Sequence, residues 1–301
     1  MKIFIPEPSE ISQQAKNFLK AQGHELYENI SANQESLIEV LFIRTYLKIT
    51  KEYLSRFPNL TYIIRAGSGL DHIDLDECKQ RHITVISSPG SNAFSVAEHA
   101  LTMLLLLLKN IIGHSRILSE GGWRSKDSQG NELRGKTIGL LGCGAVGQIL
   151  SKLLLPFEVK ILGYDKYLSP DKFKELHIQQ VTLSELLKKS DLVSIQIPLT
   201  KETVNLITVK ELSLMKKTAC LVNVSRGEIV NEDDLITVLS QGKINSAALD
   251  VVKGEPTPNR RLSALENIFI TPHIAGFTVE ADEAIATDAV HNFLKAIEDH
   301  K

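Results

Sequence analysis

The chain has 301 residues, and 34 lysines and arginines against 36 aspartates and glutamates give a formal net charge of −2. Hydrophobic residues make up 43% of the chain and charged residues 23%, which excludes a disordered chain and is typical of a globular protein. The near-neutral charge, with no basic stripe, predicts that the protein has no nucleic-acid partner. A chain of this length favours two domains over one.

Short apolar runs alternate with helical patterns over the first 90 residues. We predict strands at residues 2–6, 40–44, 60–65 and 82–86, and a helix at residues 9–22. Strands separated by helices indicate a parallel sheet with crossover connections. A long apolar helix is then predicted near residues 95–112, with Ser95 as its N-cap and Glu98 completing a capping box. The polar residues 124–131 are predicted to form a loop.

A second series of strands and helices begins at Lys136. We predict strands at residues 137–141, 160–164, 192–197, 219–224, 247–251 and 268–271, and helices at residues 146–155, 183–188 and 233–240. The last predicted helix covers residues 278–299, where apolar residues recur every four positions from Ile285 to Ile297. The two series predict an α/β fold with two doubly wound parallel sheets, a Rossmann domain inserted into a flavodoxin-like domain.

The cysteines and the apolar segments predict neither a metal site nor a membrane span. Cys78, Cys143 and Cys220 are scattered in no metal-ligand or disulfide spacing, which favours a reducing compartment. The first apolar run stops before Glu7 and is too short for a signal peptide. The most apolar segment ends at Lys109, well short of the roughly 18 residues that a span needs. We therefore expect a cytoplasmic protein with no membrane partner.

A glycine-rich turn follows the first strand of the second series. Residues 139–147 read GLLGCGAVG and contain the pattern G-x-G-x-x-G at Gly142, Gly144 and Gly147. The first glycine permits a tight turn, the second lets the backbone approach a pyrophosphate, and the third lets the helix pack closely on the strand. The N–H groups at the start of the helix attract phosphates. The pattern alone is also compatible with an ordinary glycine-rich turn.

The next predicted strand ends in an acidic residue. Asp165 follows Gly144 by 21 residues, which is where a dinucleotide-binding fingerprint places its ribose-binding acid. A carboxylate there accepts hydrogen bonds from the ribose hydroxyls and repels a 2′-phosphate, so we predict NAD rather than NADP. The neighbouring Lys166 weakens this preference. A methyltransferase could present a similar loop and acid, so that class of enzyme remains open on these residues.

Three chemically versatile side chains follow the ends of later strands. Since ligands bind beyond the carboxyl ends of a doubly wound sheet, Arg226, Glu255 and His273 are candidate site residues. The planar guanidinium of Arg226 can bind a carboxylate, and His273 can exchange a proton with a carbonyl oxygen. Glu255, if paired with His273, would favour the imidazolium form. Taken singly, each of the three is also compatible with a structural role.

Over essentially its whole length the chain resembles the D-isomer-specific 2-hydroxyacid dehydrogenase family. The resemblance rests on the glycine-rich turn and on residues 65–74 (RAGSGLDHID), 95–98 (SVAE), 223–227 (NVSRG), 248–251 (ALDV) and 271–273 (TPH). It implies NAD-dependent hydride transfer between a D-2-hydroxy acid and its 2-keto acid, with Arg226, Glu255 and His273 as the catalytic set. A methyltransferase gives these three residues no role, so that alternative falls away.

The resemblance also implies which residues bind the cofactor and the substrate. The implied cofactor-binding residues are Gly142, Gly144, Ala145, Val146, Gly147, Asp165, Pro198, Val224, Ser225, Asp250 and Gly276. The implied substrate-binding residues are Arg44, Arg65, Ser68 and Gly69. Residues 95–276 would form the NAD-binding domain, and residues 1–94 with 277–301 the substrate-binding domain. Closure of the two domains would exclude water from the hydride path.

The substrate and the assembly are less closely constrained. Arg44, Lys48 and Arg65 could bind a phosphate on the substrate, or Arg44 and Lys48 could be solvated surface residues. Glyoxylate or hydroxypyruvate reduction, and a non-catalytic protein that senses NAD(H), remain alternatives. The apolar helix near residues 95–112 favours a homodimer, and no regulatory domain is expected. His99 on that helix is expected to pack, and Trp123 to make an anchoring contact.

Overall fold

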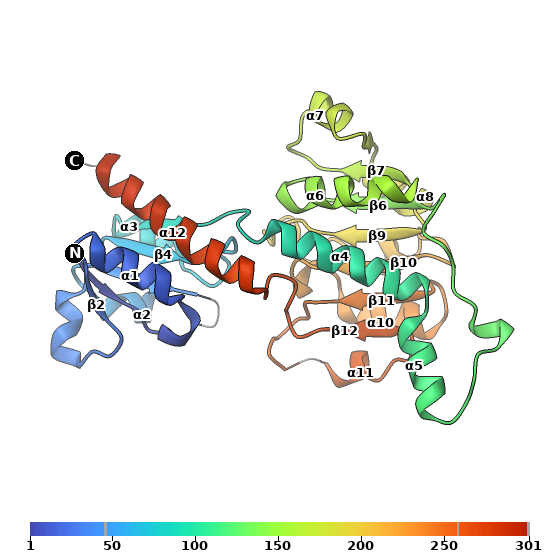
Figure 1. Cartoon of the computed structure of the whole chain (residues 1–301), viewed down its shortest axis with the longest axis horizontal. Helices are drawn as coiled ribbons and strands as arrows, with labels where there is room; N and C mark the ends of the chain where they lie inside the picture. The colour runs from blue at the N-terminus through green and yellow to red at the C-terminus, as the bar shows by residue number, and fades with distance from the viewer. Residues whose placement is uncertain (45–46, 258, 300–301) are drawn as a thin grey trace. The chain divides into compact units, whose positions relative to one another are not determined.

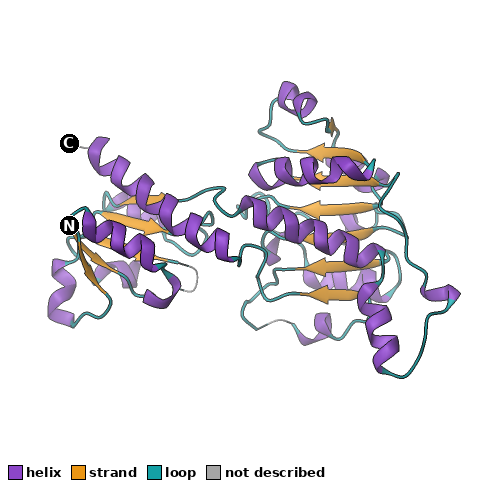
Figure 2. Ribbon diagram, in the orientation of Figure 1, coloured by secondary structure: helices purple, strands orange, loops and turns teal. Residues whose placement is uncertain are grey.

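The computed structural model describes residues 1–44, 47–257 and 259–299. The chain forms two compact units (Figures 1 and 2). Unit 1 comprises Met1–Asn92 and Phe277–Lys301, and unit 2 comprises Ala93–Gly276. Each unit has its own parallel sheet with helices on both faces, which confirms the predicted fold class.

Unit 1 contains a five-stranded sheet in the order β2-β1-β3-β4-β5. The strands are β1 (Lys2–Phe4), β2 (Glu25–Tyr27), β3 (Val40–Ile43), β4 (Tyr62–Arg65) and β5 (Thr84–Ser87). The helices are α1 (Gln13–Ala21), α2 (Lys51–Ser55), α3 (Leu75–Gln80) and α12 (Val279–Asp299), with the short 3-10 helices η1 (Pro8–Glu10) and η2 (Ala32–Leu37). The predicted apolar stripe of the last helix is buried, because Ile285, Ala289 and Phe293 of α12 pack against one face of this sheet together with α1.

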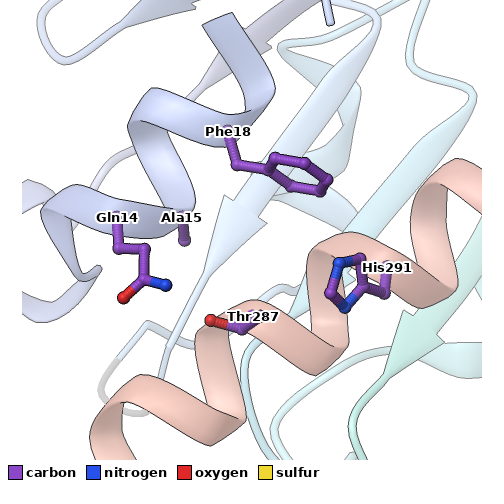
Figure 3. Close-up of a pocket in the computed structure, with 5 residues that line it drawn as sticks. All are labelled: Gln14, Ala15, Phe18, Thr287 and His291. Atoms are coloured by element: carbon purple, nitrogen blue, oxygen red, sulfur yellow. The ribbon is translucent and has the colours of Figure 1, made fainter. Parts of the chain in front are cut away.

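A small cavity lies between α1 and α12 (Figure 3). It has a volume of ≈ 190 Å³ and is lined by Gln14, Ala15, Phe18, Thr287 and His291. The ring of Phe18 meets the imidazole of His291 edge-on at a centroid distance of 5.1 Å. These residues fill the seam between two packed helices, and the cavity contains none of the residues predicted to bind ligand.

Unit 2 contains a seven-stranded parallel sheet in the order β12-β11-β10-β9-β6-β7-β8. The strands are β6 (Thr137–Leu141), β7 (Lys160–Tyr164), β8 (Gln179–Gln180), β9 (Leu192–Ile195), β10 (Cys220–Asn223), β11 (Ser246–Leu249) and β12 (Ile268–Ile270). The chain leaves β6 for β7 on one side and later returns to pair β9 on the other. The strand order therefore reverses between β6 and β9, and ligands bind outside the carboxyl ends of the strands at such a switch point.

Helices cover both faces of the unit 2 sheet. The helices of unit 2 are α4 (Ala93–Leu108), α5 (Ile111–Ser119), α6 (Ala145–Leu154), α7 (Pro170–Glu175), α8 (Leu183–Lys189), α9 (Val209–Leu212), α10 (Glu232–Ser240) and α11 (Arg260–Ser263), with the short 3-10 helices η3 (Lys126–Ser128), η4 (Leu155–Phe157) and η5 (Gly227–Ile229). Leu104 of α4 and Leu150 of α6 belong to the core on one face, and Leu187 of α8 and Leu235 of α10 to the core on the other.

Local sequence signals explain where many helices begin. The side chain of Ser12 accepts a hydrogen bond from the first turn of α1, and Asn231 does the same for α10. Thr182 and Glu185 form a capping box at the start of α8. Such contacts satisfy N–H groups that have no partner within the helix.

The predicted helix near residues 95–112 is wrong in two respects. α4 begins at Ala93, so Ser95 lies within its first turn and is not the N-cap. The helix ends at Leu108, and α5 starts at Ile111 after Asn110, whose φ of 50° is left-handed and breaks the helix. Among the described helices, none taken alone is long and apolar enough to cross a membrane; α4 and α5 are so only jointly, across a bend of 58°.

Candidate active site

The glycine-rich turn connects β6 to α6 and has the geometry that a bound pyrophosphate requires. Gly142 has a φ of 99°, a conformation that favours glycine. A β-carbon on Gly147 would lie 2.4 Å from the carbonyl oxygen of Gly142, so a side chain there would push α6 away from the turn. A β-carbon on Gly144 would meet nothing within 4 Å, so open space lies beside the N-terminus of α6.

A side chain that the sequence analysis does not single out donates a hydrogen bond to the backbone of this turn. The amide Nε2 of Gln196, after β9, donates to the carbonyl oxygen of Gly142 at 2.7 Å, and the Ser194 hydroxyl donates to Gln196 Oε1 at 2.8 Å. Cys143 inside the turn is buried, and this burial raises the pKa of its thiol to about 12. Gln196 gave no sequence signal, because a glutamine after a strand belongs to no dinucleotide-binding pattern.

Asp165 lies at the end of β7, directly beside the turn. One carboxylate oxygen accepts a hydrogen bond from the backbone N–H of Cys143 at 2.8 Å, and the other accepts from those of Tyr167 and Leu168 at 2.8 and 3.1 Å. These bonds fix the carboxylate in one orientation. The next residue, Lys166, donates to Glu202 at 2.8 Å, and this hydrogen bond raises the pKa of Lys166 and lowers that of Glu202.

An open cavity of ≈ 430 Å³ adjoins Asp165 at the carboxyl ends of β7 and β8. Its lining residues are Tyr164, Asp165, Gln180, Val181, Thr182 and Glu185. The other predicted cofactor-binding residues lie in segments that begin at the same end of the sheet. Ala145 and Val146 start α6, Pro198 follows β9, Val224 and Ser225 follow β10, and Gly276 follows β12. The Ser225 hydroxyl donates to the Ile197 carbonyl, which joins the segments after β9 and β10.

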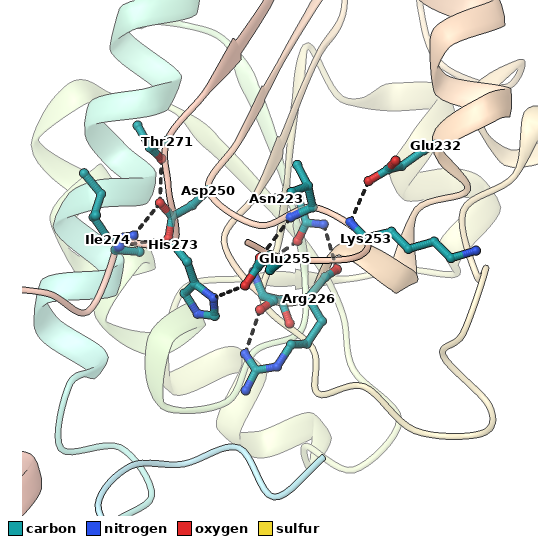
Figure 4. Close-up of polar contacts among 12 residues, drawn as sticks. Asn223, Arg226, Glu232, Asp250, Lys253, Glu255, Thr271, His273 and Ile274 are labelled. Carbon is teal, nitrogen blue, oxygen red and sulfur yellow. Dashed lines mark hydrogen bonds and ion pairs between the residues drawn. The ribbon is translucent and has the colours of Figure 1, made fainter. Parts of the chain in front are cut away.

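Glu255 and His273 form a hydrogen-bonded pair in unit 2 (Figure 4). His273 Nδ1 lies 2.7 Å from Glu255 Oε2, and the backbone N–H of Val252 donates to Glu255 Oε1 at 3.0 Å. Burial alone would raise the pKa of Glu255, but the hydrogen bond and charge of His273, the Val252 N–H and the charge of Arg226 outweigh it. The pKa of Glu255 is therefore below its usual range, and the carboxylate is ionised at neutral pH.

Arg226 sits on a tight turn that packs against the segment carrying Glu255. Asn223 closes the turn, because its side chain donates to the Arg226 carbonyl at 2.9 Å and accepts from the Ser225 N–H at 3.0 Å. A β-carbon on Gly227 would lie 2.1 Å from the carbonyl carbon of Val252. Only a residue without a side chain lets the two segments meet, which gathers Arg226, Glu255 and His273 in one place (Figure 4).

The turn that carries His273 is built around Asp250. His273 has a φ of 55°, an uncommon left-handed conformation for a residue other than glycine. The buried carboxylate of Asp250 accepts hydrogen bonds from the Thr271 hydroxyl at 2.5 Å and from the backbone N–H groups of Ile274 and Ala275 at 2.9 and 2.8 Å. The side chain of Asp250, a predicted cofactor-binding residue, is 0% exposed and bonds within the chain.

His99, which we predict to pack, also makes polar contacts. Its Nε2 lies 3.2 Å from Thr271 Oγ1 and 3.5 Å from Asp250 Oδ1. The residue therefore extends the polar network behind the His273 turn from α4, more than 150 residues earlier in the chain.

In unit 1, Ser68 and Gly69 follow β4 on a loop that is tied to the next strand. The Gly67 N–H donates to the Ser88 hydroxyl at 2.9 Å, and the Gly90 N–H donates to the Ser68 hydroxyl at 3.3 Å. The guanidinium of Arg65 is buried, donates to the Ala66 carbonyl and occupies the space where a side chain on Gly67 would lie.

The structure places Arg44 in the interior of unit 1. Its guanidinium donates to Asp282 of α12 at 2.5 Å and to the Glu10 carbonyl at 3.2 Å. Since only 7% of Arg44 is exposed, the alternative that it is a solvated surface residue is wrong. Lys48, by contrast, is exposed. The two candidate phosphate-binding arginines, Arg44 and Arg65, are thus both engaged within unit 1.

Comparisons of sequence and fold show which known proteins this chain is similar to. The sequence profile of the D-isomer specific 2-hydroxyacid dehydrogenase family, NAD binding domain, matches residues 101–275. The hydroxypyruvate reductase of Thermotoga maritima is 36% identical over 263 residues, which cover 86% of this chain and 85% of that protein. The D-3-phosphoglycerate dehydrogenase of Archaeoglobus fulgidus is 37% identical over 288 residues, which cover 93% of this chain and 54% of that protein.

A solved structure extends the likeness to the fold. The D-lactate dehydrogenase of Aquifex aeolicus, in complex with NAD and lactic acid, superposes with a TM-score of 0.86 at 30% identity and covers 100% of this chain and 96% of its own. The chain therefore belongs to the D-isomer specific 2-hydroxyacid dehydrogenase family. The residues that match the family's NAD-binding domain all lie in unit 2. The chain spans about half the length of the Archaeoglobus fulgidus phosphoglycerate dehydrogenase (54%).

Proposed function

We propose that this protein is an NAD-dependent dehydrogenase that interconverts a D-2-hydroxy acid and its 2-keto acid. The observation that carries the proposal is the 2.7 Å pair of His273 and Glu255 beside the Arg226 turn. This pair lies in the same unit as a glycine-rich turn with open space at Gly144. A proton-exchanging imidazole, a guanidinium and a dinucleotide-binding turn are the parts that hydride transfer to a carbonyl needs.

Each residue of the set has a distinct task. Arg226 binds the substrate carboxylate through its planar guanidinium and polarises the neighbouring carbonyl. His273 gives a proton to the carbonyl oxygen during reduction and takes it from the hydroxyl during oxidation. The ionised Glu255 holds the imidazole through Nδ1, which leaves Nε2 for the substrate, and stabilises the imidazolium. Ser68 and Gly69 offer backbone N–H groups to the substrate carboxylate.

The residues of unit 2 fit a bound NAD. The α6 N-terminus and the turn at Gly144 would hold the pyrophosphate, and the fixed Asp165 carboxylate would accept the ribose hydroxyls. NAD, when bound, supplies the hydride acceptor for oxidation and, when reduced, the hydride donor. The carboxylate of Asp165 would repel a 2′-phosphate, which supports NAD over NADP.

For the substrate we propose D-3-phosphoglycerate, which the protein would convert to 3-phosphohydroxypyruvate in serine biosynthesis. The Archaeoglobus fulgidus relative supports this substrate. One observation favours the second candidate, a reductase of hydroxypyruvate or glyoxylate. Arg44 is paired with Asp282 and Arg65 lies beneath Gly67, so a phosphate would have to compete with these contacts. The Thermotoga maritima hydroxypyruvate reductase, of which the chain covers 85%, supports the second candidate too.

The test is NADH formation by the purified protein with D-3-phosphoglycerate, D-glycerate and D-lactate in parallel. Turnover selective for the phosphorylated acid supports the first candidate, and turnover of D-glycerate alone supports the second. NADH binding without turnover of any of the three would contradict both D-3-phosphoglycerate and hydroxypyruvate as substrates, and would favour glyoxylate reduction or a protein that senses the cofactor.

We also propose that the protein forms a homodimer through unit 2. Helix α5 carries Ile111, Ile112 and Leu118, yet none of its nine described residues is buried. Trp123, which follows it, is 75% exposed. Exposed large apolar side chains on one helix and the loop after it are typical of a protein interface. Sedimentation should show a dimer in the wild type and a monomer in the double variant L118E/W123E; a wild-type monomer would contradict the proposal.

A further inference from the structure

The carboxylate of Asp250 is buried, and both of its oxygens accept hydrogen bonds from groups of the protein. Oδ1 receives the Thr271 hydroxyl and the Ile274 N–H, and it lies 3.5 Å from His99 Nε2. Oδ2 receives the Ala275 N–H. A buried carboxylate without hydrogen-bond donors is costly in free energy. The bonds in such a network strengthen one another, so the loss of one donor would weaken the remaining bonds to Asp250.

The hydrogen-bond pattern determines which atom of His99 carries a proton. A carboxylate cannot donate, so the one hydroxyl hydrogen of Thr271 must point to Asp250. Thr271 Oγ1 can then only accept from His99 Nε2, at 3.2 Å. His99 is therefore a donor at Nε2, and it fixes both the hydroxyl of Thr271 and the oxygen of Asp250.

The same network holds His273 in an unfavourable backbone conformation. A left-handed φ in a residue other than glycine persists only when the surroundings impose it. The N–H of His273 donates to the Asp250 carbonyl at 2.8 Å, and the next two N–H groups donate to the Asp250 carboxylate. The direction in which the His273 imidazole points toward Glu255 thus depends on how firmly Asp250 is held.

We infer that His99 is a positioning residue for His273, acting through Thr271 and Asp250. This inference rests on the proposed function, in which His273 exchanges the proton with the substrate. His99 touches neither Glu255 nor Arg226 among the contacts of the described residues, so its action is on the geometry of the turn and not on the proton itself.

The test compares His99→Gln with His99→Asn. The glutamine amide reaches as far as Nε2 and can still donate to Thr271, whereas the asparagine amide, one methylene shorter, cannot. We expect His99→Asn to lower kcat about tenfold, the factor for one lost hydrogen bond to a charged network, with KM for NAD unchanged within twofold. His99→Gln should retain most of the turnover. Thr102→Ala on the exposed face of the same helix is the matched control.

Amide hydrogen exchange of residues 271–276 provides a readout that does not depend on activity. His99→Asn should speed the exchange of the Ile274 and Ala275 amides about tenfold, and His99→Gln should not. Thr271→Val removes the acceptor of His99, so its effect and that of His99→Asn should overlap in the double variant.

Exchange in His99→Asn that matches the wild type, or fully additive effects in the double variant, would overturn the inference. A wild type that turns over no substrate would refute the proposed function instead, and the exchange rates would still decide whether His99 holds the turn. If His99→Asn does not fold, His99→Leu, which fills the space but cannot donate to Thr271, replaces it in the comparison with His99→Gln.

Discussion

Removing the charge of Glu255 while keeping its shape is the most direct test of the His273 pair. Glu255→Gln can still accept a hydrogen bond from Nδ1 but no longer stabilises an imidazolium. A hydrogen bond to a charged group contributes about 1.5–3 kcal/mol when buried. The two side chains are 36% and 34% exposed, so solvent screening reduces this to about 1–2 kcal/mol. We therefore expect kcat to fall about 5- to 30-fold.

The assay is steady-state reduction of the 2-keto acid, with NADH affinity measured separately by fluorescence. Glu175→Gln is the matched control, because it removes the charge of an exposed pair with Lys172 on α7. Glu255→Gln should leave NADH affinity unchanged, since the residue contacts no part of the glycine-rich turn among the described hydrogen bonds. A kcat within twofold of the wild type would refute the argument that the carboxylate stabilises the imidazolium.

Three further predictions concern the cofactor turn and the acid stability of unit 2. Gly147→Ala should lower Tm because its β-carbon would lie 2.4 Å from a carbonyl oxygen, whereas Gly144→Ala should keep Tm and weaken NADH binding, as calorimetry and fluorescence would show. Asp165→Ala should raise the ratio of NADP to NAD turnover; an unchanged ratio contradicts the ribose role. Burial alone would raise the pKa of Asp191, but its hydrogen bonds to Lys216 and to the Thr137 N–H outweigh burial and lower it. The stability that Asp191 contributes is therefore present above about pH 4 and is lost as the pH falls further. Asp191→Asn should flatten that acid limb in denaturant titrations, and an unaltered limb argues against it.

The elements that were predicted correctly are those whose own residues contain the signal. β6 and β7 are apolar runs, and α12 carries an apolar stripe. The spacing of apolar residues in the sequence predicts which side chains are buried, so these elements could be predicted. The edge strand β8 is two glutamines, which pair with β7 only because the neighbouring chain places them there. β2, with an exposed glutamate in three residues, was missed for the same reason.

The candidate site divides in the same way. The glycine turn and Asp165 follow from local spacing, and the catalytic set from strand ends and the family resemblance. Contacts between distant residues could not be predicted, because no local pattern encodes them. Arg44 pairs with Asp282, 238 residues later, and His99 meets Thr271, 172 residues later. Both side chains therefore had no visible partner in the sequence and were assigned to phosphate binding or packing.

The buried cysteines allow the transient opening of each unit to be measured by chemical labelling. Burial raises the pKa of Cys143 in unit 2 to about 12 and that of Cys78 in unit 1 to about 11. At neutral pH the Cys143 thiol is therefore protonated as well as buried, so alkylating reagents react poorly with the closed form. Labelling must wait for the surrounding strands and helices to separate. The alkylation rates of Cys143 and Cys78, followed by mass spectrometry, would thus report how often each unit opens.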